Sequence, residues 1–138
     1  MPISKQLILH GSIILLLGLL CGWPYARALI RGKSEVSTNA WRVAHLSLPI
    51  AAILLFAMAA VLPQLRISSA TRAWMAWLFI VSSYAFTVAL TLGACYGFRG
   101  LTFDPPLINR AVYAGNMLGA ALSLIGSILL VWGAYVSL

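Results

Sequence analysis

The chain has 138 residues, of which 62% are hydrophobic and only 8% are charged. Soluble domains carry about 25% charged residues, so this composition excludes a water-soluble globular domain and predicts an integral membrane protein. The net charge of +7 indicates contact with anionic lipid headgroups rather than with nucleic acid, because the sequence contains no basic run.

The first apolar segment predicts a membrane-spanning helix over about residues 6–26. A secretory signal peptide is the alternative, but bulky Trp23, Pro24 and Tyr25 stand where a cleavage site needs small residues. We therefore expect the helix to be retained. Three glycines at spacings of seven and four residues predict one face for close helix contact. These glycines are Gly11, Gly18 and Gly22.

A polar loop is predicted over residues 27–41, followed by a second span over about residues 42–63. His45 lies about one turn inside this span, and Pro49 follows four residues later. Because proline has no N–H, the carbonyl of His45 lacks its helical donor. Ionisable groups are costly at membrane depth, which makes His45 a candidate functional residue.

A third span is predicted over about residues 72–96. Four side chains repeat along it at intervals of four residues and form a mildly polar stripe, with Tyr84 beside them. Either they bond carbonyls of their own helix or of a neighbouring one, or they line a cavity near mid-membrane. The four residues are Ser83, Thr87, Thr91 and Cys95.

The loop over residues 98–110 contains Asp104-Pro105-Pro106, which cannot continue a helix. A fourth span is predicted over about residues 108–137, with Asn116 roughly two turns inside it. Its regularly spaced glycines predict a second packing face, toward a helix of the same chain or of a neighbouring subunit. These glycines are Gly115, Gly119, Gly126 and Gly133.

The predicted fold is all-α: an integral membrane four-helix bundle, a single transmembrane domain over residues 1–138, assembled as a homo-oligomer. Lys and Arg number three on the side of the termini and six on the opposite side. This distribution favours the opposite side as the cytoplasmic one.

The two histidines enter the membrane from opposite sides, which separates His10 from His45 by about 20 Å. They cannot share a metal within one subunit. Cys21 and Cys95 are too few for a disulfide scaffold, and no Cys-x-x-Cys-His motif for covalent haem is present. No acidic residue lies within a span, so carboxylate di-iron centres and acid-dependent multidrug transport are excluded as well.

His45 shares its interface with three arginines, Arg42, Arg99 and Arg110. In one hypothesis the neutral imidazole is the single axial ligand of a haem iron, and the arginines meet the propionates. Such an iron keeps one position open, as Lewis-acid catalysis requires. In the alternative, the histidine is hydrogen-bonded to a neighbour and the arginines are solvated among headgroups.

The second span resembles the second helix of bacterial styrene oxide isomerases, in Trp41-Arg42-Val43-Ala44-His45 and in the apolar run ending at Val61-Leu62-Pro63. Arg99-Gly100-Leu101-Thr102-Phe103, followed by Pro105, is similar to the third loop of that family. Leu9-His10-Gly11 is similar to the start of its first helix.

This resemblance implies a homotrimer in the bacterial inner membrane that holds non-covalent ferric haem b at subunit interfaces. One histidine ligates the iron in that family, and it matches His45. The resemblance further implies that the iron acts as a Lewis acid on small lipophilic aryl epoxides and yields aldehydes such as phenylacetaldehyde, in styrene degradation.

The chain departs from the family at three polar positions. Where the family has an asparagine, an acid and a tyrosine, this sequence has Ala51, Ser82 and Leu90. Tyr84 and Asn116 are candidate catalytic groups in their place. Two alternatives stay open: a haem-binding membrane protein for sensing, electron transfer or haem handling, and a non-catalytic accessory subunit.

Overall fold

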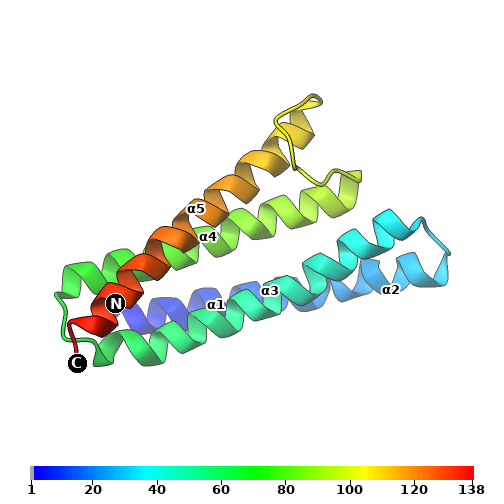
Figure 1. The fold of residues 1–138 in the computed structure, drawn as a ribbon. Helices are drawn as coiled ribbons and strands as arrows, with labels where there is room; N and C mark the ends of the chain where they lie inside the picture. Colours follow the sequence, from blue (N-terminus) through cyan, green and yellow to red (C-terminus); the bar gives the residue numbers. More distant parts are fainter. Residues whose placement is uncertain (1) are drawn as a thin grey trace.

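The computed structural model describes residues 2–138, and the chain in this range folds into long helices joined by short connections (Figure 1). The elements are α1 (Ile3–Leu20), α2 (Gly22–Ile30), α3 (Glu35–Val61), the 3-10 turn η1 (Leu62–Gln64), α4 (Ser69–Tyr96) and α5 (Leu107–Tyr135). Because α2 continues α1 after an interruption at Cys21, the chain makes four passes, each long and apolar enough to cross a membrane. The predicted all-α architecture with four spanning helices is confirmed.

The prediction of a polar loop over residues 27–41 is wrong for most of its length. Helix α2 continues to Ile30 and α3 begins at Glu35, so only four residues connect them. The side chain of Ser34 caps α3 by accepting a hydrogen bond from the Ser37 N–H, and Glu35 in the first turn suits the helix dipole. Polar residues therefore extend the helix beyond its apolar section, which hydrophobicity alone does not reveal.

Helix α1 packs against α3 through the glycines predicted from their spacing. A Cβ added at Gly11 would lie 2.7 Å from the Phe56 ring, and one at Gly18 would lie 2.5 Å from Cδ of Pro49. Such distances leave no room for a side chain. The first predicted packing face is thus confirmed as the α1–α3 interface.

Helices α4 and α5 form the second helix pair, and the α5 glycines Gly115, Gly119 and Gly126 face α4, whereas Gly133 faces Leu65 and Ile67 in the connection before α4. A Cβ added at Gly119 would lie 2.8 Å from the Phe86 ring, and one at Gly126 would lie 3.1 Å from the Phe79 ring. The hydroxyl of Ser82 donates to the carbonyl of Gly119 across the interface at 2.7 Å. The second packing face therefore serves a helix of the same chain.

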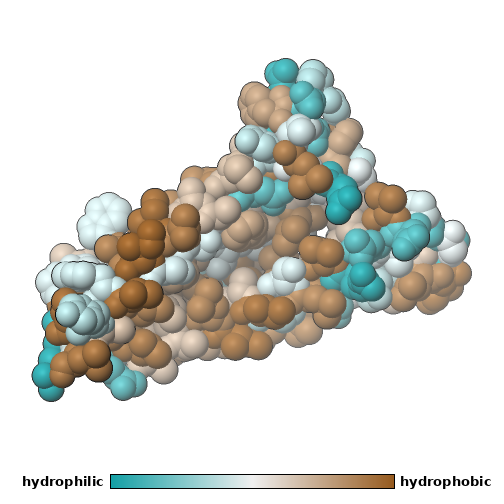
Figure 2. Space-filling view, in the orientation of Figure 1, coloured by the Kyte–Doolittle hydropathy of each residue, from teal (hydrophilic) through white to brown (hydrophobic). Residues whose placement is uncertain are grey.

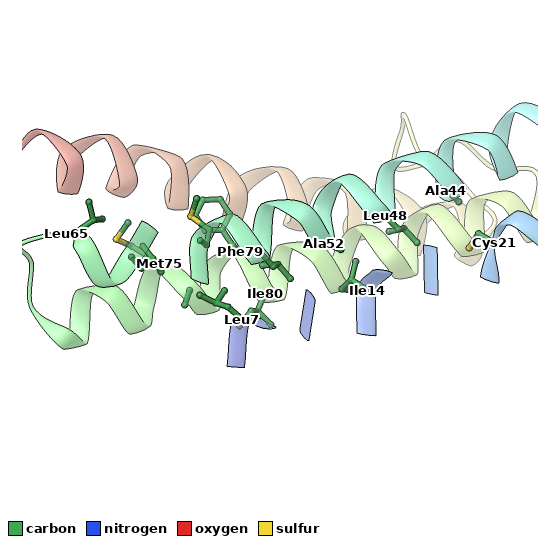
Figure 3. Close-up of a cluster of buried hydrophobic side chains, with 14 residues drawn as sticks. Leu7, Ile14, Cys21, Ala44, Leu48, Ala52, Leu65, Met75, Phe79 and Ile80 are labelled. Carbon is green, nitrogen blue, oxygen red and sulfur yellow. The ribbon is translucent and has the colours of Figure 1, made fainter. Parts of the chain in front are cut away.

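The two helix pairs, α1–α3 and α4–α5, pack together near the termini and diverge toward the α2–α3 and α4–α5 connections, here called the loop end (Figure 1). A cluster of buried apolar side chains, including Leu48, Leu55 and Ile80, runs along the bundle and holds the pairs together (Figure 3). The face of the bundle in Figure 2 is largely hydrophobic, and many large apolar side chains are exposed, as expected for helices that face lipid tails.

The polar stripe on α4 is mostly satisfied within its own helix. Ser83 donates to the carbonyl of Phe79 at 2.8 Å, Thr87 to that of Ser83 at 2.8 Å, and Thr91 to that of Thr87 at 2.7 Å. These bonds confirm the local alternative for the three hydroxyls. Cys95, the fourth member of the stripe, is exposed.

Candidate functional site

The side chain of His45 is half-buried where α3 crosses the junction between α1 and α2. Its Nδ1 lies 2.9 Å from the carbonyl oxygen of Gly18. A carbonyl can only accept a hydrogen bond, so Nδ1 carries the proton in this contact and Nε2 keeps its lone pair. The ring is thereby oriented with one nitrogen free to act as a ligand.

The junction between α1 and α2 explains why His45 finds this partner. Helix α1 ends at Leu20, so the carbonyl of Gly18 belongs to the last four of the helix, which lack regular intrahelical donors. The imidazole lies over Gly22, where an added Cβ would be 2.9 Å from its Cε1. The ring of Tyr25 lies beside it, with centroids 6.2 Å apart.

Gly18 and Gly22 were predicted only as packing residues, and their role in seating His45 was missed. A signal was present in the spacing. Gly18 and Gly22 are four residues apart, as are His45 and Pro49. Antiparallel packing pairs these residues in reverse order, so Pro49 meets Gly18 and His45 meets Gly22.

The donor set around His45 fits a cofactor that needs one protein ligand. Metal-binding histidines usually donate their other ring N–H to a carboxylate or a backbone carbonyl, as His45 does here. Residues 2–138 contain no group of three or more His, Cys, Asp and Glu side chains that could hold a bare ion. A haem iron takes its other four ligands from the porphyrin and needs only one imidazole from the chain.

The second histidine has a separate environment. The Nδ1 of His10 lies 3.0 Å from the hydroxyl of Tyr84, and the Trp77 ring centroid is 5.7 Å away. His45 lies against Gly22, and His10 stands about 18 Å before Gly22 along the first span. The two histidines are therefore at different depths of the bundle. The structure therefore places Tyr84 with His10 and not beside His45, where it was expected as a pocket group.

The predicted arginines are divided between two places. Arg42, Arg99 and Asn116 line a cleft of about 530 Å³ between α3, α4 and α5, here called the hairpin cleft. Figure 2 shows it as a hollow at the loop end with hydrophilic surface around it. His45 is not among its lining residues. Arg110 lies elsewhere, with its guanidinium 5.3 Å from the centre of the Phe103 ring.

The three positions that depart from the family pattern are also dispersed. Ala51 packs against the apolar core, and Ser82 is buried with its hydroxyl bonded to the Gly119 carbonyl. Leu90 lines the hairpin cleft. None of the three places a free polar group next to His45.

A comparison with curated proteins gives no match. The family model described as styrene oxide isomerase matches residues 3–135. This match covers nearly the whole chain, including all four spanning helices. The chain therefore belongs to the styrene oxide isomerase family.

Proposed function

We propose that the protein is a haem-b-dependent membrane isomerase that converts small, lipophilic aryl epoxides into aldehydes. Family membership supports an isomerase of the styrene oxide isomerase type. The observation that supports a haem cofactor is the hydrogen bond from Nδ1 of His45 to the carbonyl of Gly18. This bond leaves Nε2 as a neutral, oriented donor at the membrane interface.

The chain's own residues would bind and orient the cofactor. His45 would be the axial ligand, and the Gly18 carbonyl would fix the tautomer and the orientation of its imidazole. Gly22 leaves the space in which the ring lies. Of the arginines predicted at the propionates, Arg42 and Arg99 line the hairpin cleft, and Arg110 lies against the Phe103 ring.

When bound, ferric haem b would supply Lewis-acid chemistry for isomerising an epoxide to an aldehyde, a reaction that needs no net oxidation and no added water. Val43 and Leu46, apolar residues that flank His45 in the sequence of α3 and are exposed in one chain, would border the site and limit the access of water. Such surroundings also suit a lipophilic substrate that arrives from the bilayer.

We further propose a homotrimer in the bacterial inner membrane. His45 is only half-buried within one chain, and one α1–α3 pair does not surround a porphyrin. A neighbouring copy that packs over this face would complete the pocket.

One observation favours a second candidate, a haem-binding membrane protein without isomerase activity. Three positions at which the family has polar side chains could orient an epoxide. Here two of them hold the apolar residues Ala51 and Leu90, and the hydroxyl at the third, Ser82, is bonded to the Gly119 carbonyl. Tyr84 is bonded to His10. Sensing, electron transfer or haem handling needs no such groups.

The deciding experiment is an absorption spectrum of the detergent-purified protein, with His45→Ala as the test variant. His10→Ala is the matched control, because it removes the other intramembrane imidazole. We expect a Soret band in the wild type and in His10→Ala, and none in His45→Ala. The wild type should also convert styrene oxide into phenylacetaldehyde.

Three results would redirect the proposal. A Soret band of full intensity in His45→Ala would overturn the ligand assignment. Haem binding without turnover on a broad epoxide panel would support the second candidate. No cofactor after expression with added haem would indicate an accessory subunit.

A further inference from the structure

The hairpin cleft is a built cavity that the isomerase proposal does not explain. Its walls come from the first turns of α3, the last turns of α4 and the start of α5. One wall is apolar and includes Ala89, Gly93 and Val112, all of which are buried. The polar side chains of the cleft are Glu35, Asn39, Arg42, Arg99 and Asn116.

The lining of the cleft does not suit haem iron or a neutral epoxide. None of its residues is a His, Cys, Met or Tyr, the side chains that commonly ligate haem iron. A small epoxide carries no charge with which a guanidinium could pair. The cleft is therefore not a second copy of the His45 site.

The charges of the cleft match a monoanion. Two arginines and one glutamate leave one net positive charge in the lining. The Nη2 of Arg42 donates to Oδ1 of Asn39 at 2.6 Å, and its other N–H groups are left to bind phosphate oxygens. The amide of Asn116 donates to the carbonyl of Arg99 at 3.4 Å, which links the α4–α5 connection to α5.

The position of the cleft points to a membrane lipid as the source of this anion. It opens at the loop end, where the helix pairs diverge (Figure 1) and where the arginines are exposed. Basic pockets between transmembrane helices bind anionic lipid headgroups. We propose that the hairpin cleft binds one anionic phospholipid, with its phosphate between Arg42 and Arg99 and an acyl chain along the wall of Ala89, Gly93 and Val112. The lipid fills the space between the two helix pairs.

The test measures the thermal stability and the bound lipid of the full-length protein in dodecyl maltoside micelles that contain either phosphatidylglycerol or phosphatidylcholine. A ligand that binds the folded state raises Tm with its concentration. We expect phosphatidylglycerol to raise Tm more than phosphatidylcholine does. Native mass spectrometry should show one retained phosphatidylglycerol per chain.

Arg99→Ala is the test variant, and Arg31→Ala is its matched control. Arg31 is an exposed arginine at the C-terminus of α2 and does not line the cleft. Arg99→Ala should weaken phosphatidylglycerol binding by about tenfold or more, as expected for the loss of a charge-assisted pair, and Arg31→Ala by less than about threefold. Arg99→Lys, which keeps the charge but not the fork of donors, should fall between them.

Several outcomes would overturn the proposal. Equal stabilisation by the two lipids would show that the cleft does not select an anionic headgroup. Equal loss of binding in Arg99→Ala and Arg31→Ala would show general attraction to a basic surface. Stabilisation of the same size by glycerol 3-phosphate alone would make the ligand a soluble phosphate. If Arg99→Ala fails to fold, Arg99→Gln and Arg99→Lys give the same comparison.

Discussion

The Nδ1–H of His45 donates to the carbonyl of Gly18, a residue 27 positions earlier in the chain, across the α1–α3 interface. The bond depends on two features of the junction between α1 and α2: α1 ends at Leu20, and the chain lacks side chains at Gly18 and Gly22 where α3 approaches. The orientation of the candidate iron ligand is thus a consequence of how these two helices pack.

Gly22→Ala should weaken haem binding without removing any ligand. The new Cβ would lie 2.9 Å from Cε1 of His45, so the ring must rotate and its bond to Gly18 must lengthen. Losing such an outer hydrogen bond costs about 10- to 100-fold in metal affinity. The measurement is Soret absorbance per mole of folded protein during a haem titration.

Gly126→Ala is the control for Gly22→Ala. Its Cβ would be crowded by the Phe79 ring at 3.1 Å, but in the α4–α5 pair. It should lower stability while the folded protein keeps its haem affinity. Equal haem affinity in Gly22→Ala and wild type would contradict the proposal that Gly22 leaves the space for the His45 ring.

Gly18→Ala should destabilise the bundle by about 1–3 kcal/mol, the usual cost of overpacking. Its Cβ would lie 2.5 Å from Cδ of Pro49 and 2.9 Å from Cβ of Leu48, so α1 and α3 must separate. Reversible unfolding in mixed micelles measures this free energy. Leu16→Ala, on the exposed face of α1, should cost much less. Helix propensity cannot explain a loss in Gly18→Ala, because Ala favours a helix more than Gly does. An equal loss in the two variants would contradict the packing explanation.

The sequence was sufficient to predict features that depend on local pattern. The four apolar spans follow from hydropathy, and the packing faces follow from the spacing of glycines such as Gly18 and Gly126. The pairing of Tyr84 with His10 was not predictable in this way. It depends on the axial offset between α1 and α4, which is set by the lengths of their end turns and by tertiary packing.

The tautomer of His45 could not be predicted from the sequence either, because it also depends on tertiary packing. The position of Pro49 indicated this turn of α3, because proline has no N–H for the carbonyl of His45. The carbonyl that matters for the imidazole belongs to Gly18 on another helix. Its availability follows from the end of α1 at Leu20, and no helix break was predicted within the first span.

The His10–Tyr84 contact should contribute a measurable coupling between the two helix pairs. It joins α1 to α4 by a side-chain hydrogen bond of 3.0 Å, and interhelical hydrogen bonds in membranes average about 0.6 kcal/mol, with a maximum of about 1.7 kcal/mol. A double-mutant cycle of His10→Ala, Tyr84→Phe and the double variant isolates this term, since each single change removes the bond. Unfolding free energies in mixed micelles should show a favourable coupling of about 0.6 kcal/mol or more.

The pair Ser12→Ala and Tyr84→Phe is the control, because the Ser12 hydroxyl bonds only within its own helix, to the carbonyl of Ile8. Coupling as small for His10 as for Ser12 would mean that the bond does not hold the pairs together.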